Sequence, residues 1–235
     1  MISKVSESAD AAVADIPDGA TIMIGGFGLA GQPVQLIDAL VAHGPSELTI
    51  VSNNAGNGET GLAALLKTGK VRKVICSFPR QADSQVFDEL YLAGKLELEL
   101  VPQGNLGERI RAAGAGIGAF FSPTGYGTEL AEGKEARTIN GRNYLLEYPI
   151  HADYALIAAL HGDRWGNLVY RKTARNFAPM MATAATVTIA QVDSIVELGS
   201  LDPEAVATPG IFVNRLVEVG ERAWLKNGEF VGGVA

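Results

Sequence analysis

Cysteine is almost absent from this sequence, which contains a single one, Cys76, among 235 residues. One cysteine excludes an internal disulfide and any metal site built from several thiolates. Cys76 ends the apolar run of residues 71–76, so we expect a buried and unreactive thiol. The three histidines are far apart in the sequence, and they predict neither a catalytic triad nor a metal site.

Long apolar runs are also missing. No stretch approaches the ~18 residues that a membrane-spanning helix requires, which predicts no membrane insertion. The first residues are not followed by the apolar segment that a secretory signal carries. Both features favour a cytoplasmic protein.

Positive charge is scarce, with 19 Lys and Arg against 26 Asp and Glu and a formal net charge of −7. The densest basic group is Lys70, Arg72 and Lys73, which we interpret as a solvated entry into a strand. Nucleic-acid binding is not expected, because contact with phosphate backbones requires clustered Lys and Arg.

The residues that are abundant point to an alternating fold. Hydrophobic residues make up 47% of the chain, enough for a sizeable core. The 28 glycines recur at the ends of apolar runs, where strands and helices are joined by turns. Strands predicted at 20–24, 48–52, 71–78 and 96–101 alternate with helices at 33–42, 61–67, 83–93 and 106–113. This order predicts an α/β fold with an open, mostly parallel sheet and helices on both faces.

The second half continues the sheet after an irregular region. Residues 120–143 are expected to form loops or a hairpin. Further strands are predicted at 155–160, 168–170 and 186–192, with a helix at 179–185. We expect residues 1–219 to form one domain and residues 220–235, which show no periodicity, to form a flexible tail. Ligands should bind at the loops that follow the parallel strands.

Residues 25–31 contain four glycines between the first strand and a helix that starts near Pro33. Glycine lets the backbone approach a ligand closely, and a helix N-terminus offers N–H groups and partial positive charge. A ligand that carries phosphate is therefore expected, with a tight turn that binds nothing as the alternative.

The same stretch matches the dinucleotide pattern G-x-G-x-x-G from Gly26 to Gly31. An NAD site, however, needs an acidic residue after the second strand to hold the ribose, and here that strand ends in Ser52-Asn53-Asn54. No Gly-Lys-Ser/Thr follows the glycines, which excludes a P-loop. The predicted ligand is thus neither NAD nor ATP.

Residues 18–33 resemble the signature of the first subunit of family I CoA-transferases. Five further blocks resemble the same family, at residues 51–56, 101–104, 108–112, 122–128 and 170–177. The resemblance covers about residues 3–219. It is greatest to the branch that acts on 3-oxoadipate, with the branch that acts on acetoacetate next.

The resemblance implies an enzyme that moves CoA from succinyl-CoA to a 3-oxo acid in a complex with a second subunit. In this family a glutamate attacks the acyl-CoA thioester, and the released CoA thiolate then forms a thioester with that glutamate. CoA and succinyl-CoA are substrates, and neither a permanently bound cofactor nor a metal is implied. The glutamate belongs to the second subunit. Glu59 is the nearest imitation here, and a polar residue before a short helix is the better interpretation.

The resemblance also assigns site residues. It implies that the CoA-binding segment consists of Gly25, Gly26, Phe27, Gly28, Leu29, Ala30 and Gly31. Asn53 and Gln103 match positions beside the reacting acyl group, where amide N–H donors stabilise an oxyanion. Ordinary turn chemistry is the alternative for both residues.

Two sets of basic residues have two interpretations each. We expect Arg80, after the third strand, either to bind the second carboxylate of the acceptor acid or to pair with Asp83 or Asp88. Arg171, Lys172 and Arg175 are suited either to CoA phosphates or to ion pairs.

Two rival hypotheses come from other classes of protein. An NAD-dependent oxidoreductase is disfavoured by the missing acidic residue after the second strand. A sensor domain for a phosphorylated metabolite is disfavoured because such sensors usually carry a DNA-binding helical module, and this acidic sequence offers none.

Overall fold

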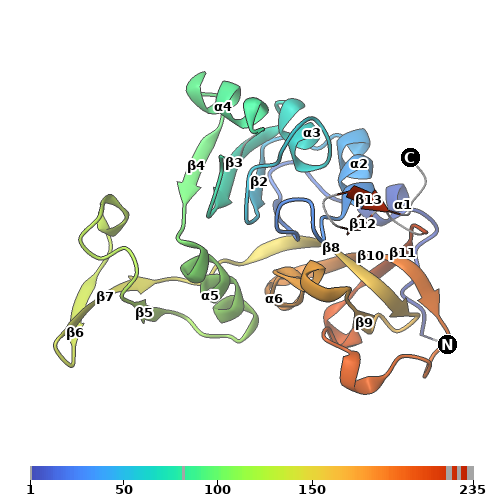
Figure 1. Ribbon diagram of the computed structural model, residues 1–235. Helices are drawn as coiled ribbons and strands as arrows, with labels where there is room; N and C mark the ends of the chain where they lie inside the picture. Colours follow the sequence, from blue (N-terminus) through green and yellow to red (C-terminus); the bar gives the residue numbers. More distant parts are fainter. Residues whose placement is uncertain (1, 81–82, 221–223, 227–228, 232–235) are drawn as a thin grey trace.

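The computed structural model of the chain describes residues 2–80, 83–220, 224–226 and 229–231. Its main element is an eight-stranded sheet in the order β11-β10-β8-β1-β2-β3-β4, with β9 paired to β8 (Figure 1). All neighbours in this order run parallel, and only β9 runs antiparallel to β8. The strands are β1 (Thr21–Ile24), β2 (Leu48–Val51), β3 (Val71–Cys76), β4 (Glu97–Leu100), β8 (Ala152–Asp163), β9 (Leu168–Val169), β10 (Ala185–Val196) and β11 (Arg215–Glu218). The predicted open, mostly parallel sheet is confirmed.

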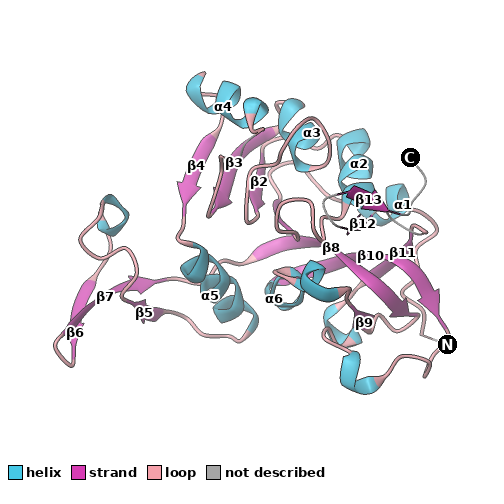
Figure 2. Ribbon diagram, in the orientation of Figure 1, coloured by secondary structure: helices cyan, strands magenta, loops and turns pink. Residues whose placement is uncertain are grey.

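Helices cover both faces of this sheet, as predicted (Figure 2). On β1, the side chains of Ile22 and Ile24 face one core and that of Met23 faces the other, because successive residues of a strand point to opposite faces. The first core is closed by α1 (Ala9–Val13), α2 (Val34–His43), α3 (Leu62–Lys67) and α4 (Gln85–Leu92). The second core is closed by α5 (Gln103–Gly114) and α6 (Ala178–Ala184).

The order of the strands reverses at β1. This strand pairs with β2 on one side, where Met23 is opposite Val51, and with β8 on the other, where Met23 is opposite Ala155. The chain leaves β1 towards β2 and leaves β8 towards β10, so the connections diverge between the two strands. Open α/β sheets bind ligands at the carboxyl ends of strands at such a point. The glycine-rich residues 25–31 lie there.

A separate antiparallel sheet joins β5 (Phe120–Ser122), β7 (Arg142–Glu147) and β6 (Ala136–Ile139), in that order. It lies to one side of the parallel sheet, beyond α5 (Figure 1). The hairpin β6–β7 turns at Asn140 and Gly141, both at positive φ, as two-residue hairpin turns require. The expected hairpin is confirmed, whereas β5 was not predicted.

Several boundaries differ from the sequence prediction. The helix expected at 106–113 begins three residues earlier, at Gln103, and β8 extends over 152–163 where only 155–160 was expected. The helix α1 and the strand β11 were not predicted. The 3-10 helices are η1 (Glu129–Ala131), η2 (Lys172–Arg175), η3 (Pro203–Ala205) and η4 (Gly210–Phe212).

At the C-terminus, β12 (Trp224–Lys226) pairs antiparallel with β13 (Glu229–Val231). Other residues of the predicted tail lie outside the described part of the chain, so the flexible tail of 220–235 and the domain boundary at 219 stay predictions. Within the described ranges, no helix combines the length and the apolar character needed to cross a membrane.

Candidate active site

The glycine-rich segment forms a tight loop over the end of β1. The Gly25 N–H donates to the Leu156 carbonyl oxygen at 3.0 Å, which continues the pairing with β8. Phe27 and Ala30 then exchange two backbone hydrogen bonds of 3.0 and 3.1 Å. This closes a turn at whose tip Phe27 and Leu29 are exposed. The tip projects two apolar side chains and unshielded backbone from the carboxyl edge of the sheet.

The segment of residues 172–176 packs directly against this loop. A Cβ atom at Gly31 would overlap the carbonyl oxygen of Ala174, so only glycine allows the two backbones to approach this closely. Between them lies a pocket of about 610 Å³ lined by Phe27, Ala30, Lys172, Thr173, Arg175 and Asn176. Two of the three basic residues with open roles, Lys172 and Arg175, thus lie beside the glycine loop.

The start of helix α2 offers less to an anion than the sequence predicts. The buried side chain of Gln191 accepts a hydrogen bond from the Leu36 N–H at 3.1 Å through Oε1, and the Val34 N–H donates to the Gln32 carbonyl oxygen at 3.0 Å. Two N–H groups of the first turn are therefore satisfied within the protein. Any phosphate at this edge would depend on the loop and the neighbouring cations rather than on the helix terminus.

Three polar side chains from successive strand ends meet in a second cluster. Asn53 follows β2, Ser77 follows β3, and Gln103 begins α5 just after β4. The Oδ1 atom of Asn53 accepts hydrogen bonds from Gln103 Nε2 and from Ser77 Oγ, both at 2.8 Å. Parallel strands bring their carboxyl ends to one edge, which explains how residues 24 and 50 positions apart come together.

These contacts fix the orientation of the Asn53 amide. Because Oδ1 receives two donors, the N–H groups of the same amide point in the opposite direction. Asn53 is only 2% exposed, whereas Gln103 lies at the surface. The arrangement is a small set of neutral donors held at a strand edge. Asn53 and Gln103 were both predicted to lie there, and Ser77 was missed because a single serine after a strand is an ordinary turn residue.

Gln32 connects the two clusters. Its side chain is 6% exposed and lies where a Cβ atom at Gly61 would overlap its Oε1 atom. A Cβ at Gly26 would in turn lie 3.2 Å from the Cα of Gln32. Within the described residues, Gln32 Oε1 is a buried acceptor without a hydrogen-bond donor. The glycine loop and residues 53–61 therefore pack on opposite sides of one glutamine.

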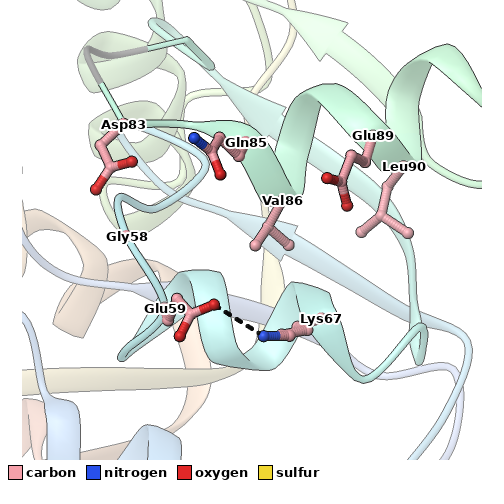
Figure 3. A pocket seen from close by; sticks show the side chains of 8 residues that line it. All are labelled: Gly58, Glu59, Lys67, Asp83, Gln85, Val86, Glu89 and Leu90. Carbon is pink, nitrogen blue, oxygen red and sulfur yellow. Dashed lines mark hydrogen bonds and ion pairs between the residues drawn. The ribbon is translucent and has the colours of Figure 1, made fainter.

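Glu59 lies elsewhere, in a pocket of about 390 Å³ between α3 and α4. Its Oε1 atom pairs with Lys67 Nζ at 3.0 Å, and its side chain is 79% exposed; Figure 3 shows the two charged groups facing each other. This pocket shares no residue with the glycine loop or with the Asn53 cluster. The geometry agrees with the interpretation of Glu59 as a polar residue before a short helix.

Arg80 donates from Nε to Asp88 Oδ1 at 2.7 Å and stays largely exposed. Of the two carboxylate partners expected for it, the structure has Asp88. Whether Arg80 also binds substrate stays a prediction, since Gln81 beside it lies outside the described residues.

The remaining reactive side chains have structural roles. Burial raises the pKa of the Cys76 thiol to about 12, which confirms a buried and unreactive cysteine. His43 contacts the Ile16 carbonyl oxygen at 2.9 Å, and His161 contacts Ser194 Oγ at 2.7 Å. The part of the chain that the structure describes contains no group of three His, Cys, Asp or Glu able to hold a metal ion.

Comparison with known proteins identifies relatives over most of the chain. The family model described as coenzyme A transferase matches residues 6–219. The first of the two subunits of the 3-oxoadipate CoA-transferase of Pseudomonas putida is 70% identical over 95% of this chain and 96% of its own length. The corresponding subunit of the succinyl-CoA:3-ketoacid coenzyme A transferase of Xanthomonas campestris (strain B100) is 53% identical over 86% of this chain and 83% of its own length.

Among solved structures, an acyl-CoA transferase of Escherichia coli O157:H7, in a thioester complex with CoA, superposes with a TM-score of 0.82 at 25% identity. The match covers 98% of this chain and 50% of that protein, so the present chain spans half of its length.

Proposed function

Because this chain belongs to the coenzyme A transferase family, we propose that it is the first subunit of a 3-oxoadipate CoA-transferase. With a second subunit it transfers CoA from succinyl-CoA to 3-oxoadipate. The 70% identity over 95% of the chain to the Pseudomonas putida protein carries this proposal. The 53% identity to a succinyl-CoA:3-ketoacid transferase makes acetoacetate the less favoured acceptor.

The nucleophile in this proposal is a glutamate of the second subunit. Its carboxylate attacks the thioester carbonyl of succinyl-CoA, forming a mixed anhydride and releasing CoA as a thiolate. The thiolate attacks the glutamyl carbonyl, succinate leaves, and a glutamyl–CoA thioester remains. The carboxylate of 3-oxoadipate reverses these steps, so that the glutamate is regenerated and 3-oxoadipyl-CoA leaves. The exposed ion pair of Glu59 with Lys67 supports the view that this chain lacks that nucleophile.

Asn53 and Gln103 are assigned to the oxyanion. Each attack on a carbonyl places negative charge on its oxygen, and donors that are already oriented stabilise that charge without reorganisation. The double acceptance at Asn53 Oδ1 supports this role, because it fixes the direction of the Asn53 N–H groups. Both side chains are neutral, so they add donors without adding a fixed charge.

The glycine loop, residues 25–31, is assigned to CoA. Its exposed backbone lets a ligand approach closely, and Lys172 and Arg175 beside it suit the phosphates of CoA. CoA enters and leaves as a substrate, and the proposed steps use only carboxylates and a thiolate. No permanently bound cofactor is therefore part of this proposal.

The test is a mixing experiment. The purified chain alone should not transfer CoA from succinyl-CoA to 3-oxoadipate, and activity should appear when the second subunit is added. The reconstituted enzyme should prefer 3-oxoadipate to acetoacetate. Turnover by the isolated chain would contradict the proposal and make Glu59→Ala the next variant to measure, and a preference for acetoacetate would overturn the assigned acceptor.

A further inference from the structure

Asn176 has an unusual backbone for a residue with a side chain. It follows η2 with φ 23° and ψ −112°, a conformation that side chains rarely adopt and that often marks functional segments. Lys172, at the start of the same short turn, also has a positive φ of 48°. Such a conformation persists only where surrounding contacts hold it.

The Asn176 side chain supplies contacts to both ends of the glycine loop. Its Oδ1 atom accepts a hydrogen bond from the Gly26 N–H at 3.1 Å, and its Nδ2 atom donates to the Ala30 carbonyl oxygen at 2.9 Å. The same amide is anchored to its own turn, where Oδ1 accepts from the Phe177 N–H at 2.7 Å. One side chain thus bridges two residues of the glycine loop, which lies far earlier in the chain.

Asn140 shows what an asparagine at positive φ does without such contacts. It has φ 50° in the hairpin turn β6–β7, far in the sequence from the glycine loop. Asparagine is common in such turns because it tolerates the left-handed region, and glycine would serve equally well. Tolerance of a positive φ therefore accounts for Asn140 but not for the two contacts that Asn176 makes with the loop.

The glycine loop needs an external contact of this kind. Glycines give its backbone freedom, and its tip is closed only by the two hydrogen bonds between Phe27 and Ala30. We propose that Asn176 is a positioning residue that holds the glycine loop in the conformation that receives the CoA thioester. The proposal rests on the proposed function, and it adds a residue outside the segment assigned to CoA. The pocket beside the loop, which Asn176 also lines, would lose its shape with the loop.

The test compares three variants of the assembled two-subunit enzyme. Asn176→Gly removes the bridge while relieving the backbone strain, and Asn176→Asp keeps the acceptor for Gly26 but puts an acceptor against the Ala30 carbonyl. Asn140→Gly is the matched control. Because small misplacements of binding groups cost up to about 10²-fold, both Asn176 variants should raise the KM for succinyl-CoA about tenfold or more. The KM for 3-oxoadipate should change little, whereas general destabilisation would lower kcat with both substrates alike.

Hydrogen exchange of the isolated chain gives a second measurement. Peptides covering residues 25–32 should exchange faster in both Asn176 variants and not in Asn140→Gly. An assembled Asn176→Gly enzyme with the KM of the wild type would overturn the proposal, and if that variant fails to assemble, an unchanged KM in Asn176→Asp would do the same. An inactive wild-type complex would instead refute the proposed function, and unchanged exchange of the loop would then refute the bridge separately.

Discussion

The loops at the carboxyl edge of the parallel sheet and the three-stranded sheet β5-β7-β6 are positioned by different kinds of interaction. At the carboxyl edge, neutral amides do the positioning: Gln103 donates to Asn53, and Asn176 bridges the glycine loop. In the three-stranded sheet, Glu147 is 2% exposed and accepts hydrogen bonds from Lys134 Nζ at 2.7 Å and Asn105 Nδ2 at 3.0 Å.

The charges of the second region continue into the main sheet. Arg109, on α5, pairs with Glu99 Oε1 at 3.0 Å, and Glu99 Oε2 pairs with Lys73 Nζ at 2.6 Å. Charged groups that are removed from water need their partners, and loss of one partner is costly. Neutral amides can present donors to a reacting group without that dependence. Changes at the carboxyl edge should therefore affect activity, and changes in the charged network should affect stability.

The largest effect on activity is expected from Gly28→Val. Gly28 has φ 59°, and no atom lies within 4 Å of a Cβ built there, so the chain has room for a side chain. A branched residue nevertheless disfavours this φ and would project where the ligand is expected. CoA transfer should fall below detection in a complex that still assembles.

Gly133→Val is the matched control, since Gly133 has φ 73° with equally open surroundings near the three-stranded sheet. Its strain is similar, and its activity should stay measurable. Unchanged kinetics in Gly28→Val would remove the glycine loop from the site.

Gln103→Ala should be next in size. Loss of one oxyanion donor lowers kcat by about 10²–10³-fold, and the KM should change far less because the interaction forms mainly in the transition state. Glu108→Ala on the same helix, where Glu108 makes an exposed pair with Arg111, should leave kcat unchanged. A rise in KM alone would show that Gln103 contributes to ground-state binding instead.

Lys134→Ala tests the other side of the comparison. It removes the charged donor that lies 2.7 Å from buried Glu147, and hydrogen bonds to charged groups contribute about 1.5–3 kcal/mol. The free energy of unfolding should fall by roughly that amount, with kcat of the folded enzyme nearly unchanged. Lys67→Ala, which breaks an exposed pair with Glu59, should have far less effect. A large loss of kcat in Lys134→Ala without loss of stability would contradict the division between the two regions.

The smallest and most selective effect is expected at Arg80. If its guanidinium binds the second carboxylate of 3-oxoadipate, Arg80→Ala should lower kcat/KM for that acid about tenfold or more, with weak activity on acetoacetate unaffected. Asp88→Asn removes the ion pair of Arg80 and separates the two roles. Equal losses on both acids, reproduced by Asp88→Asn, would mean that Arg80 only pairs with Asp88.

The sequence predicts the fold well where a pattern is local. Ile22 and Ile24 alternate with Met23 between the two cores, and the apolar positions of α2 recur at helical spacing. Residues of β5 are too few to show a period of two, and α1 spans only five residues. These short elements are stabilised by packing and pairing that a local pattern does not contain.

The site was predictable only where a resemblance or the sheet topology reaches it. Asn53 and Gln103 follow parallel strands, so their proximity at one edge was expected. Asn176 is different, because its contacts to Gly26 and Ala30 join distant parts of the sequence and depend on how far β8 extends beyond β1. Gln191, which satisfies the first turn of α2, is equally distant in sequence. Neither contact leaves a signal in the residues nearby.

The central claim is that this chain supplies the donors and the CoA loop while the second subunit supplies the nucleophile. Intact-mass measurement of both proteins, after the complex is incubated with succinyl-CoA and quenched, tests it most directly. The account predicts a CoA thioester adduct on the second subunit, with none on this chain. An adduct on this chain, at Glu59 or elsewhere, would contradict it.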